Sequence, residues 1–125
     1  MKECDKIKNL YQELIGSTNH EFPPKGKAIQ ISNKQGVYII YSSNNKVLHV
    51  GTTKRGKTGL NQRLNNHRNG SSSFSVKYLK PNNLKLSEGF KFKYIEVENG
   101  RERGFLEALS IGLLCPAHIG TGEKT

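Results

Sequence analysis

Long apolar runs are missing from this chain of 125 residues. A helix that crosses a membrane needs about 20 apolar residues in succession, and no stretch approaches that length. The opening residues, MKECDKIKNL, also lack the apolar segment of a signal peptide. We therefore expect a soluble cytoplasmic protein with no membrane partner. We also expect one domain over residues 1–125, because the length suffices for one modest core.

Cysteine occurs only twice, as Cys4 and Cys115. The two residues lie near opposite ends of the chain, and neither belongs to a pattern with metal-ligand spacing. Isolated cysteines of this kind are typical of reduced thiols in the cytoplasm. We therefore expect no special role for them and no zinc site.

Acidic residues are absent between Glu21 and Glu88, and the whole chain carries a formal net charge of +10. One interpretation of such a span is a solvated surface that keeps the protein in solution. The other is a surface that binds a polyanion such as nucleic acid, which an uncompensated run of this length favours. The span contains twelve basic residues: Lys25, Lys27, Lys34, Lys46, Lys54, Arg55, Lys57, Arg63, Arg68, Lys77, Lys80 and Lys85.

Apolar periodicity predicts the order of the secondary structure. Residues 2–16 have the spacing of an amphipathic helix that ends at Gly16, and an arm with two prolines follows. Alternation and a polar turn then predict a hairpin with strands at 36–41 and 47–51. The remaining predicted elements are a helix within 60–68, a short helix or irregular excursion within 74–89, a strand at 90–97 and a helix at 102–115.

This order predicts an α+β fold, a small three-stranded antiparallel sheet flanked by helices, because each amphipathic element must bury its apolar face on another layer. Glu107 is unusual in this predicted fold, because it is a charged residue in an apolar helix. Between Arg103 and His118 it is the only charged residue of the last predicted helix. A carboxylate in apolar surroundings needs a compensating cation or strong donors. Metal ligation, a salt bridge and exposure on the outer face of the helix all remain open.

Other polar residues also have two interpretations. Arg63 and His67 lie four residues apart on one face of a predicted helix, which suits a surface pair or a site. Tyr38 and His49 are either cross-strand packing partners or one wall of a site, because both fall at the same end of the hairpin. Tyr41 we interpret as packing.

Four segments together carry a resemblance: GVY at 36–38, HVG at 49–51, LNQRLNNH at 60–67 and LEALSIGLLCP at 106–116. In this order and spacing the chain resembles the GIY-YIG nuclease family. The resemblance covers about 34–118, which would be the catalytic core, and leaves the helix and arm of residues 1–33 outside it.

The resemblance implies a phosphodiesterase that cuts DNA with one divalent ion, Mg²⁺ or Mn²⁺, and leaves 5′-phosphate and 3′-hydroxyl ends. In it, Glu107 matches the carboxylate that binds the metal, and Arg63 the arginine that contacts the scissile phosphate. Tyr38 matches the tyrosine that takes a proton from the attacking water, and His67 a histidine that contacts phosphate or relays a proton. The residues expected to contact DNA are Lys54, Arg55, Lys57, Arg68 and His118.

Two positions depart from the family pattern. His49 stands where the second motif usually begins with tyrosine, and His118 where an asparagine often follows the last helix. Both replacements are polar, so we keep His49 in the catalytic set, although a histidine would change the pH dependence.

Three function classes follow from these observations. The first is a metal-dependent DNA endonuclease, for example of restriction or defence type. The second is a non-catalytic DNA- or RNA-binding module on the same fold, and the third is an interaction protein with a basic surface. The N-terminal helix is either a homodimer interface or a core helix.

Overall fold

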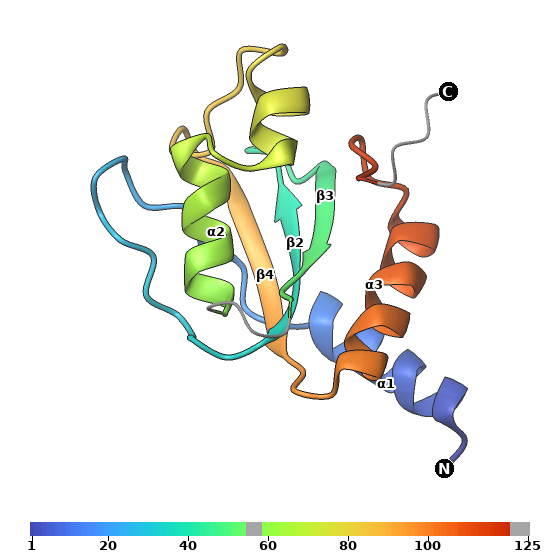
Figure 1. The fold of residues 1–125 in the computed structure, drawn as a ribbon. Coiled ribbons are helices and arrows are strands. Elements are labelled where there is room, and N and C mark those ends of the chain that lie inside the picture. Colours follow the sequence, from blue (N-terminus) through green and yellow to red (C-terminus); the bar gives the residue numbers. More distant parts are fainter. Residues whose placement is uncertain (55–58, 121–125) are drawn as a thin grey trace.

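The computed structural model describes residues 1–54 and 59–120, which form an antiparallel sheet with helices on both faces (Figure 1). The elements in chain order are α1 (Glu3–Ile15), β1 (His20–Glu21), β2 (Gly36–Tyr41), β3 (Val47–Thr52), α2 (Leu60–Asn69), the single π-helical turn η1 (Ser75–Leu79), β4 (Lys91–Glu96) and α3 (Gly100–Leu114). None of the described helices is both long enough and apolar enough to cross a membrane.

The strand order of the sheet is β1-β4-β2-β3. The three strands predicted from the sequence are present, but the sheet has four, so the predicted count was wrong. The fourth, β1, pairs His20 with Phe92 and Glu21 with Lys91. Two residues are too few to show an alternating pattern, which explains why the sequence did not reveal β1.

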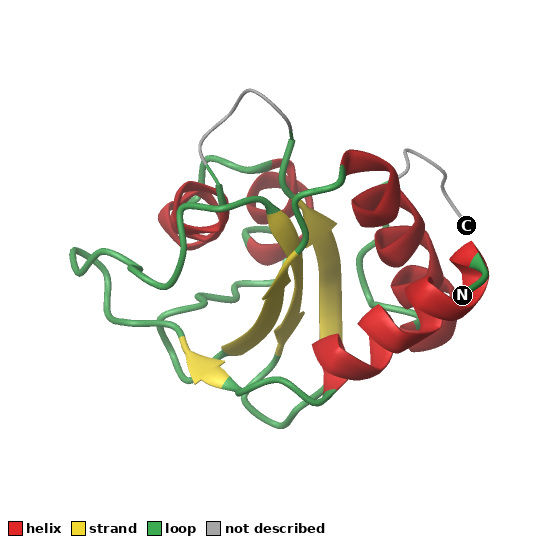
Figure 2. Ribbon diagram, turned by 90° about the horizontal axis from the view of Figure 1, so that it is seen from below, coloured by secondary structure: helices red, strands yellow, loops and turns green. Residues whose placement is uncertain are grey.

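The central strand β2 is buried on both faces, as its continuous apolar run suggests. Val37 and Ile39 belong to the core beneath α1 and α3, whereas Tyr38 and Ile40 belong to the core beneath α2 and η1. Figure 2 shows the helices on either side of the strands. Because β3 lies at the edge of the sheet, helices from both layers can meet beside it.

Helix α1 is a core helix, one of the two alternatives that the sequence left open. Its Ile7 and Leu14 are buried against the sheet and α3. Two ion pairs connect it to α3, Lys6 with Glu102 and Glu3 with Arg101, but all four side chains are partly exposed, so solvent screens both pairs and they contribute little to stability. Apolar burial therefore holds α1 in place.

Asparagines of α2 order the arm that precedes β2. The Asn61 Oδ1 atom accepts hydrogen bonds from the backbone of Ile31 and Ser32, at 2.6 and 2.9 Å. The Asn65 Oδ1 atom accepts one from the backbone of Ile29, at 3.1 Å. Helix α2 ends at Gly70, whose φ of 89° is the left-handed conformation that glycine adopts without strain.

Candidate active site

A cavity of about 280 Å³ opens beside the edge strand β3. The ionisable side chains of its lining come from four parts of the chain: His49 on β3 with Lys54 just after it, Arg63 on α2, Glu107 on α3, and His118 beyond α3. The sequence spreads these residues over 70 positions, and the meeting of the two helix layers at the sheet edge brings them together. Each of the five was a predicted site residue.

The half-buried Glu107 carboxylate faces this cavity. Among residues 1–54 and 59–120, no hydrogen bond or ion pair to it exists. Burial raises the pKa of the Glu107 carboxyl above its ordinary value, and the charges of Arg63 and Lys54 act in the opposite direction. Within the described residues Glu107 therefore forms no salt bridge, and its half-buried side chain lines the cavity. Metal ligation by Glu107 stays a prediction.

The donor set of the cavity fits a hard cation held by one protein oxygen. Within the described part of the chain, no three His, Cys, Asp or Glu side chains cluster closely enough to enclose a metal ion. A closed multi-ligand site is therefore absent there. Mg²⁺ commonly binds through one or two carboxylates, with water and substrate phosphate completing its shell, so the Glu107 carboxylate is a suitable ligand.

Tyr38 lies behind the wall of the cavity. It is fully buried, and it pairs across the hairpin with Gly51 so closely that a Cβ atom on Gly51 would overlap the tyrosine hydroxyl. Burial raises the pKa of the Tyr38 phenol well above its ordinary value, while the charge of Arg63 and a hydrogen bond from it favour the phenolate. The glycine of the second motif therefore makes room for this hydroxyl.

The Tyr38 hydroxyl contacts the Nε2 atom of His67 at 2.5 Å, and hydrogen-bond accounting fixes the direction. Ser75 donates its only hydroxyl proton to the His67 carbonyl, at 2.5 Å. Ser72, 2.9 Å from the Ser75 hydroxyl, must therefore donate to Ser75. With that proton committed, the Ser72 oxygen accepts from the His67 Nδ1 atom, at 2.6 Å.

This accounting places the proton of a neutral His67 on Nδ1. Burial lowers the pKa of the His67 imidazole well below its ordinary value, and the charges of His49, Arg63 and His118 lower it further. The ring is therefore neutral at pH 7, and its Nε2 atom has a free lone pair. We conclude that Tyr38 donates to His67, so the phenol proton already points at an acceptor.

The two departures from the family pattern, His49 and His118, form a pair. Their Nδ1 atoms are 3.3 Å apart, and the His49 ring stacks on Phe74 with centroids 4.4 Å apart. Burial, followed by the charges of His118 and Arg63, lowers the pKa of His49 to about 3. Burial also lowers the pKa of His118, helped by the charge of Lys77. At pH 7 both rings are neutral hydrogen-bonding groups.

A comparison with models of known families matches residues 34–110 to the GIY-YIG catalytic domain. The match covers well over half of the chain and includes every residue that lines the cavity except Ile111, His118 and Gly120. The chain belongs to the GIY-YIG family. This is a nuclease superfamily, as the resemblance implied. A search of curated proteins finds no match.

Three of the basic residues predicted to contact the DNA of a GIY-YIG nuclease are not part of the described lining of this cavity. Arg68 is on α2 but does not line the cavity; its guanidinium binds the backbone carbonyls of Pro24 and Lys27 in the arm. Arg55 and Lys57 fall outside the described residues. Contact of these three with DNA stays a prediction.

Sequence reasoning missed Ser72 and Ser75, which complete the hydrogen-bond chain behind the GIY-YIG tyrosine. The segment NGSSS at 69–73 predicted only the end of a helix. A serine run has no periodicity that indicates which hydroxyl turns inward, and here the buried ones are Ser72 and Ser75. The neighbouring Ser71 and Ser73 are exposed.

Proposed function

We propose that this chain is a DNA endonuclease that hydrolyses phosphodiester bonds with one Mg²⁺ or Mn²⁺ ion and leaves 5′-phosphate and 3′-hydroxyl ends. The observation that carries the proposal is the half-buried Glu107 carboxylate, which faces a cavity beside Arg63 and Lys54 and has no hydrogen-bond or ion-pair partner among the described residues. One carboxylate among cations suits a site that binds a metal ion and a phosphate together.

Arg63 is the residue that we assign to the scissile phosphate. It lines the cavity and also lies against Tyr38. A planar guanidinium presents paired donors that match two phosphate oxygens, and such donors stabilise the charge that develops in the transition state. Lys54, exposed at the rim, adds a second cation on the path of the strand.

We assign proton transfer to Tyr38 and His67. As the water oxygen bonds to phosphorus, the phenol oxygen takes the water proton and passes its own proton to the His67 Nε2 atom, 2.5 Å away. The bond from phosphorus to the 3′ oxygen breaks, and that oxygen takes up a proton from solvent. For water to reach the buried phenol, the Arg63 side chain must move from Tyr38 toward the phosphate.

A divalent ion, when bound, neutralises charge on the phosphate and on the leaving 3′ oxygen. Glu107 is the residue that would hold it, because no other acidic side chain lines the cavity in the described part of the chain. His49 and His118, as neutral rings, would hydrogen-bond the nucleic acid or ordered water rather than supply positive charge.

The test is cleavage of supercoiled plasmid by the purified protein with Mg²⁺, with Mn²⁺ and with EDTA. We expect nicked or linear product with either metal and none with EDTA, and ends that a ligase can rejoin directly. Discrete fragments would indicate recognition of a sequence, as in a restriction or defence nuclease. Cleavage that persists in EDTA would contradict the proposal.

A second function, DNA or RNA binding without cleavage, is favoured by one observation, the complete burial of Tyr38. A phenol that never meets water cannot act on it. This alternative predicts that nucleic acid binds with the salt dependence of phosphate contacts, while no metal yields cleaved plasmid.

A further inference from the structure

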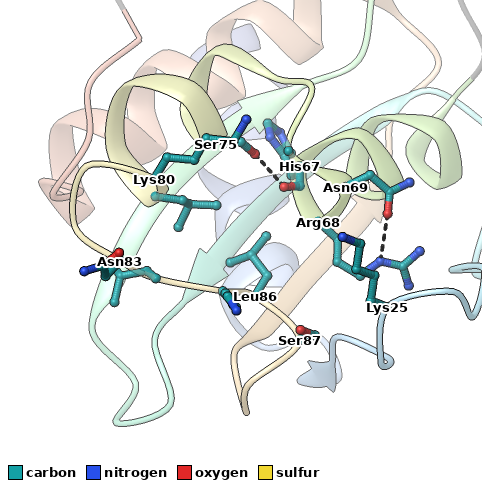
Figure 3. Close-up of a pocket in the computed structure, with 13 residues that line it drawn as sticks. Lys25, His67, Arg68, Asn69, Ser75, Lys80, Asn83, Leu86 and Ser87 are labelled. Atoms are coloured by element: carbon teal, nitrogen blue, oxygen red, sulfur yellow. Dashed lines mark hydrogen bonds between the residues drawn. The ribbon is translucent and has the colours of Figure 1, made fainter.

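A second and larger cavity, of about 450 Å³, lies beside the C-terminal turn of α2 (Figure 3). Its walls are that turn, η1, the segment after η1 and Lys25 of the arm. His67 and Ser75, which belong to the hydrogen-bond chain of Tyr38, border it as well. The first cavity contains none of its lining residues, so the two are separate.

The charge of this second cavity is entirely positive among the described residues. Lys25, Arg68, Lys80 and Lys85 line it, and no acidic side chain does. No described carboxylate lies within ion-pair distance of these four cations. An uncompensated group of this kind attracts an anion.

One of the cations is held in place. Arg68 donates to the carbonyl oxygens of Pro24 and Lys27 and to the Asn65 side chain. The exposed Lys80 side chain passes over Gly70, where an added Cβ atom would be 3.4 Å from the lysine Cε. A ligand would therefore meet one charge that is already positioned, which lowers the entropic cost of binding.

The rest of the lining is apolar and amide-bearing. Leu79 and Leu86 are buried and Leu84 is half-buried, while Asn69 and Asn83 present side-chain amides (Figure 3). Small-ligand pockets of about 300–1,000 Å³ commonly combine an apolar floor with a few polar groups. A phosphate alone would use only the cations, but a nucleotide would also cover the half-buried Leu84 with its base and face the amides with its base edge.

We propose that this second cavity binds one unpaired nucleotide of a DNA strand, with its phosphate at Lys80 and Lys85 and its base over the half-buried Leu84. The inference rests on the proposed function in that the strand is the substrate of the nuclease. A base inside a duplex is stacked and paired, so only an unpaired or extruded nucleotide can enter. The proposal therefore predicts that the DNA substrate contains a single-stranded or displaced segment.

The first test is binding of a single-stranded oligonucleotide in EDTA, where the proposed nuclease does not cut. Lys80→Gln/Lys85→Gln is compared with Lys2→Gln/Lys46→Gln, a control pair of exposed lysines that line neither cavity. Both variants lose two charges. One phosphate contact on a single strand contributes about 0.7 to the slope of log K against log salt, so we expect the slope to fall by about that amount only in the first variant.

Equal slopes in the two variants would overturn the proposal. The proposal would also be overturned if Lys80→Gln/Lys85→Gln had a lower free energy of unfolding but an unchanged salt slope. The two lysines would then only stabilise the C-terminus of α2, where the helix dipole is negative. Both readouts are independent of cleavage. A protein that never cuts can still pass this test, and an active nuclease can fail it.

The second test is an NMR titration with thymidine 5′-monophosphate and, separately, with inorganic phosphate. We expect the nucleotide to shift the methyl resonances of Leu84 and the side-chain amide of Asn83, and phosphate to leave the methyl resonances in place. Equal shifts with both probes would show that no base binds, which would refute the nucleotide assignment.

Discussion

Replacing Ser72 with alanine tests the hydrogen-bond chain behind Tyr38. The Ser72 oxygen accepts from the His67 Nδ1 atom and from the backbone N–H of Ser75, at 2.6 and 3.1 Å, and its proton goes to the Ser75 hydroxyl. The site is buried. The alanine variant therefore leaves two buried donors without an acceptor.

The magnitude follows from those two donors. Each unsatisfied buried donor costs about 1–3 kcal/mol, so Ser72→Ala should lower the free energy of unfolding by about 2–6 kcal/mol before any relaxation. Urea denaturation at pH 7 measures it. Ser71→Ala is the matched control, because the Ser71 side chain is exposed and makes one long bond of 3.3 Å; we expect a change within about 0.5 kcal/mol.

The assignment of the proton can be checked directly. Nitrogen-15 NMR of the wild-type protein should show His67 with a protonated Nδ1 and an unprotonated Nε2, and Ser72→Ala should abolish that preference. A proton on Nε2 in the wild type would refute the direction that we assign to the Tyr38 hydroxyl. A Ser72→Ala variant as stable as Ser71→Ala would refute the whole network.

Three further predictions follow. Folding lowers the pKa of His49 to about 3, and it also lowers the pKa of His67. As the pH falls below about 6.5, the unfolded chain therefore takes up protons on these histidines while the folded protein does not. Urea denaturation at pH 7 and pH 5 should show stability lost toward pH 5, by at most about 1.4 kcal/mol per pH unit for each histidine; a flat profile would contradict neutral, buried rings. Arg63→Lys should lower the cleavage rate about 100-fold and change the DNA affinity by only a few fold, because lysine lacks the planar pair of donors of a guanidinium. An unchanged cleavage rate would contradict the assignment of Arg63 to the scissile phosphate. Gly51→Ala should lower the free energy of unfolding by about 1–3 kcal/mol, because the new Cβ atom would overlap the Tyr38 hydroxyl. In the control Gly112→Ala the new Cβ atom would enter open space on α3, and the free energy of unfolding should rise by up to about 1 kcal/mol. Equal changes in the two variants would contradict the close contact between Gly51 and Tyr38.

Sequence patterns predicted the large elements because each contains a full period. The run from Gly36 to Tyr41 and the helix that carries Leu60 and Leu64 were recognised within a few residues of their observed ends. The strand β1 and the turn η1 are too short for a period to develop. Tertiary pairing, which the local sequence does not encode, decides whether such short segments become regular.

The candidate site could be predicted only in part, for a similar reason. Glu107 stood out in the sequence because it is a lone charge in an apolar helix. In the structure this residue lines the cavity beside β3. The burial of Tyr38 was not predictable from a strand pattern that places tyrosine equally well on either face. Ser72 and Ser75 became visible only when η1 brought their hydroxyls against His67.

The central claim, that Glu107 makes this cavity a metal-dependent nuclease site, is tested most directly by one comparison. Supercoiled plasmid is incubated with Mg²⁺ or Mn²⁺ and the wild type, Glu107→Gln or Glu98→Gln, the last being an exposed carboxylate outside the cavity. Our account predicts cleavage by the wild type and Glu98→Gln, and by Glu107→Gln no cleavage but retained DNA binding. Cleavage by Glu107→Gln at the wild-type rate would contradict it.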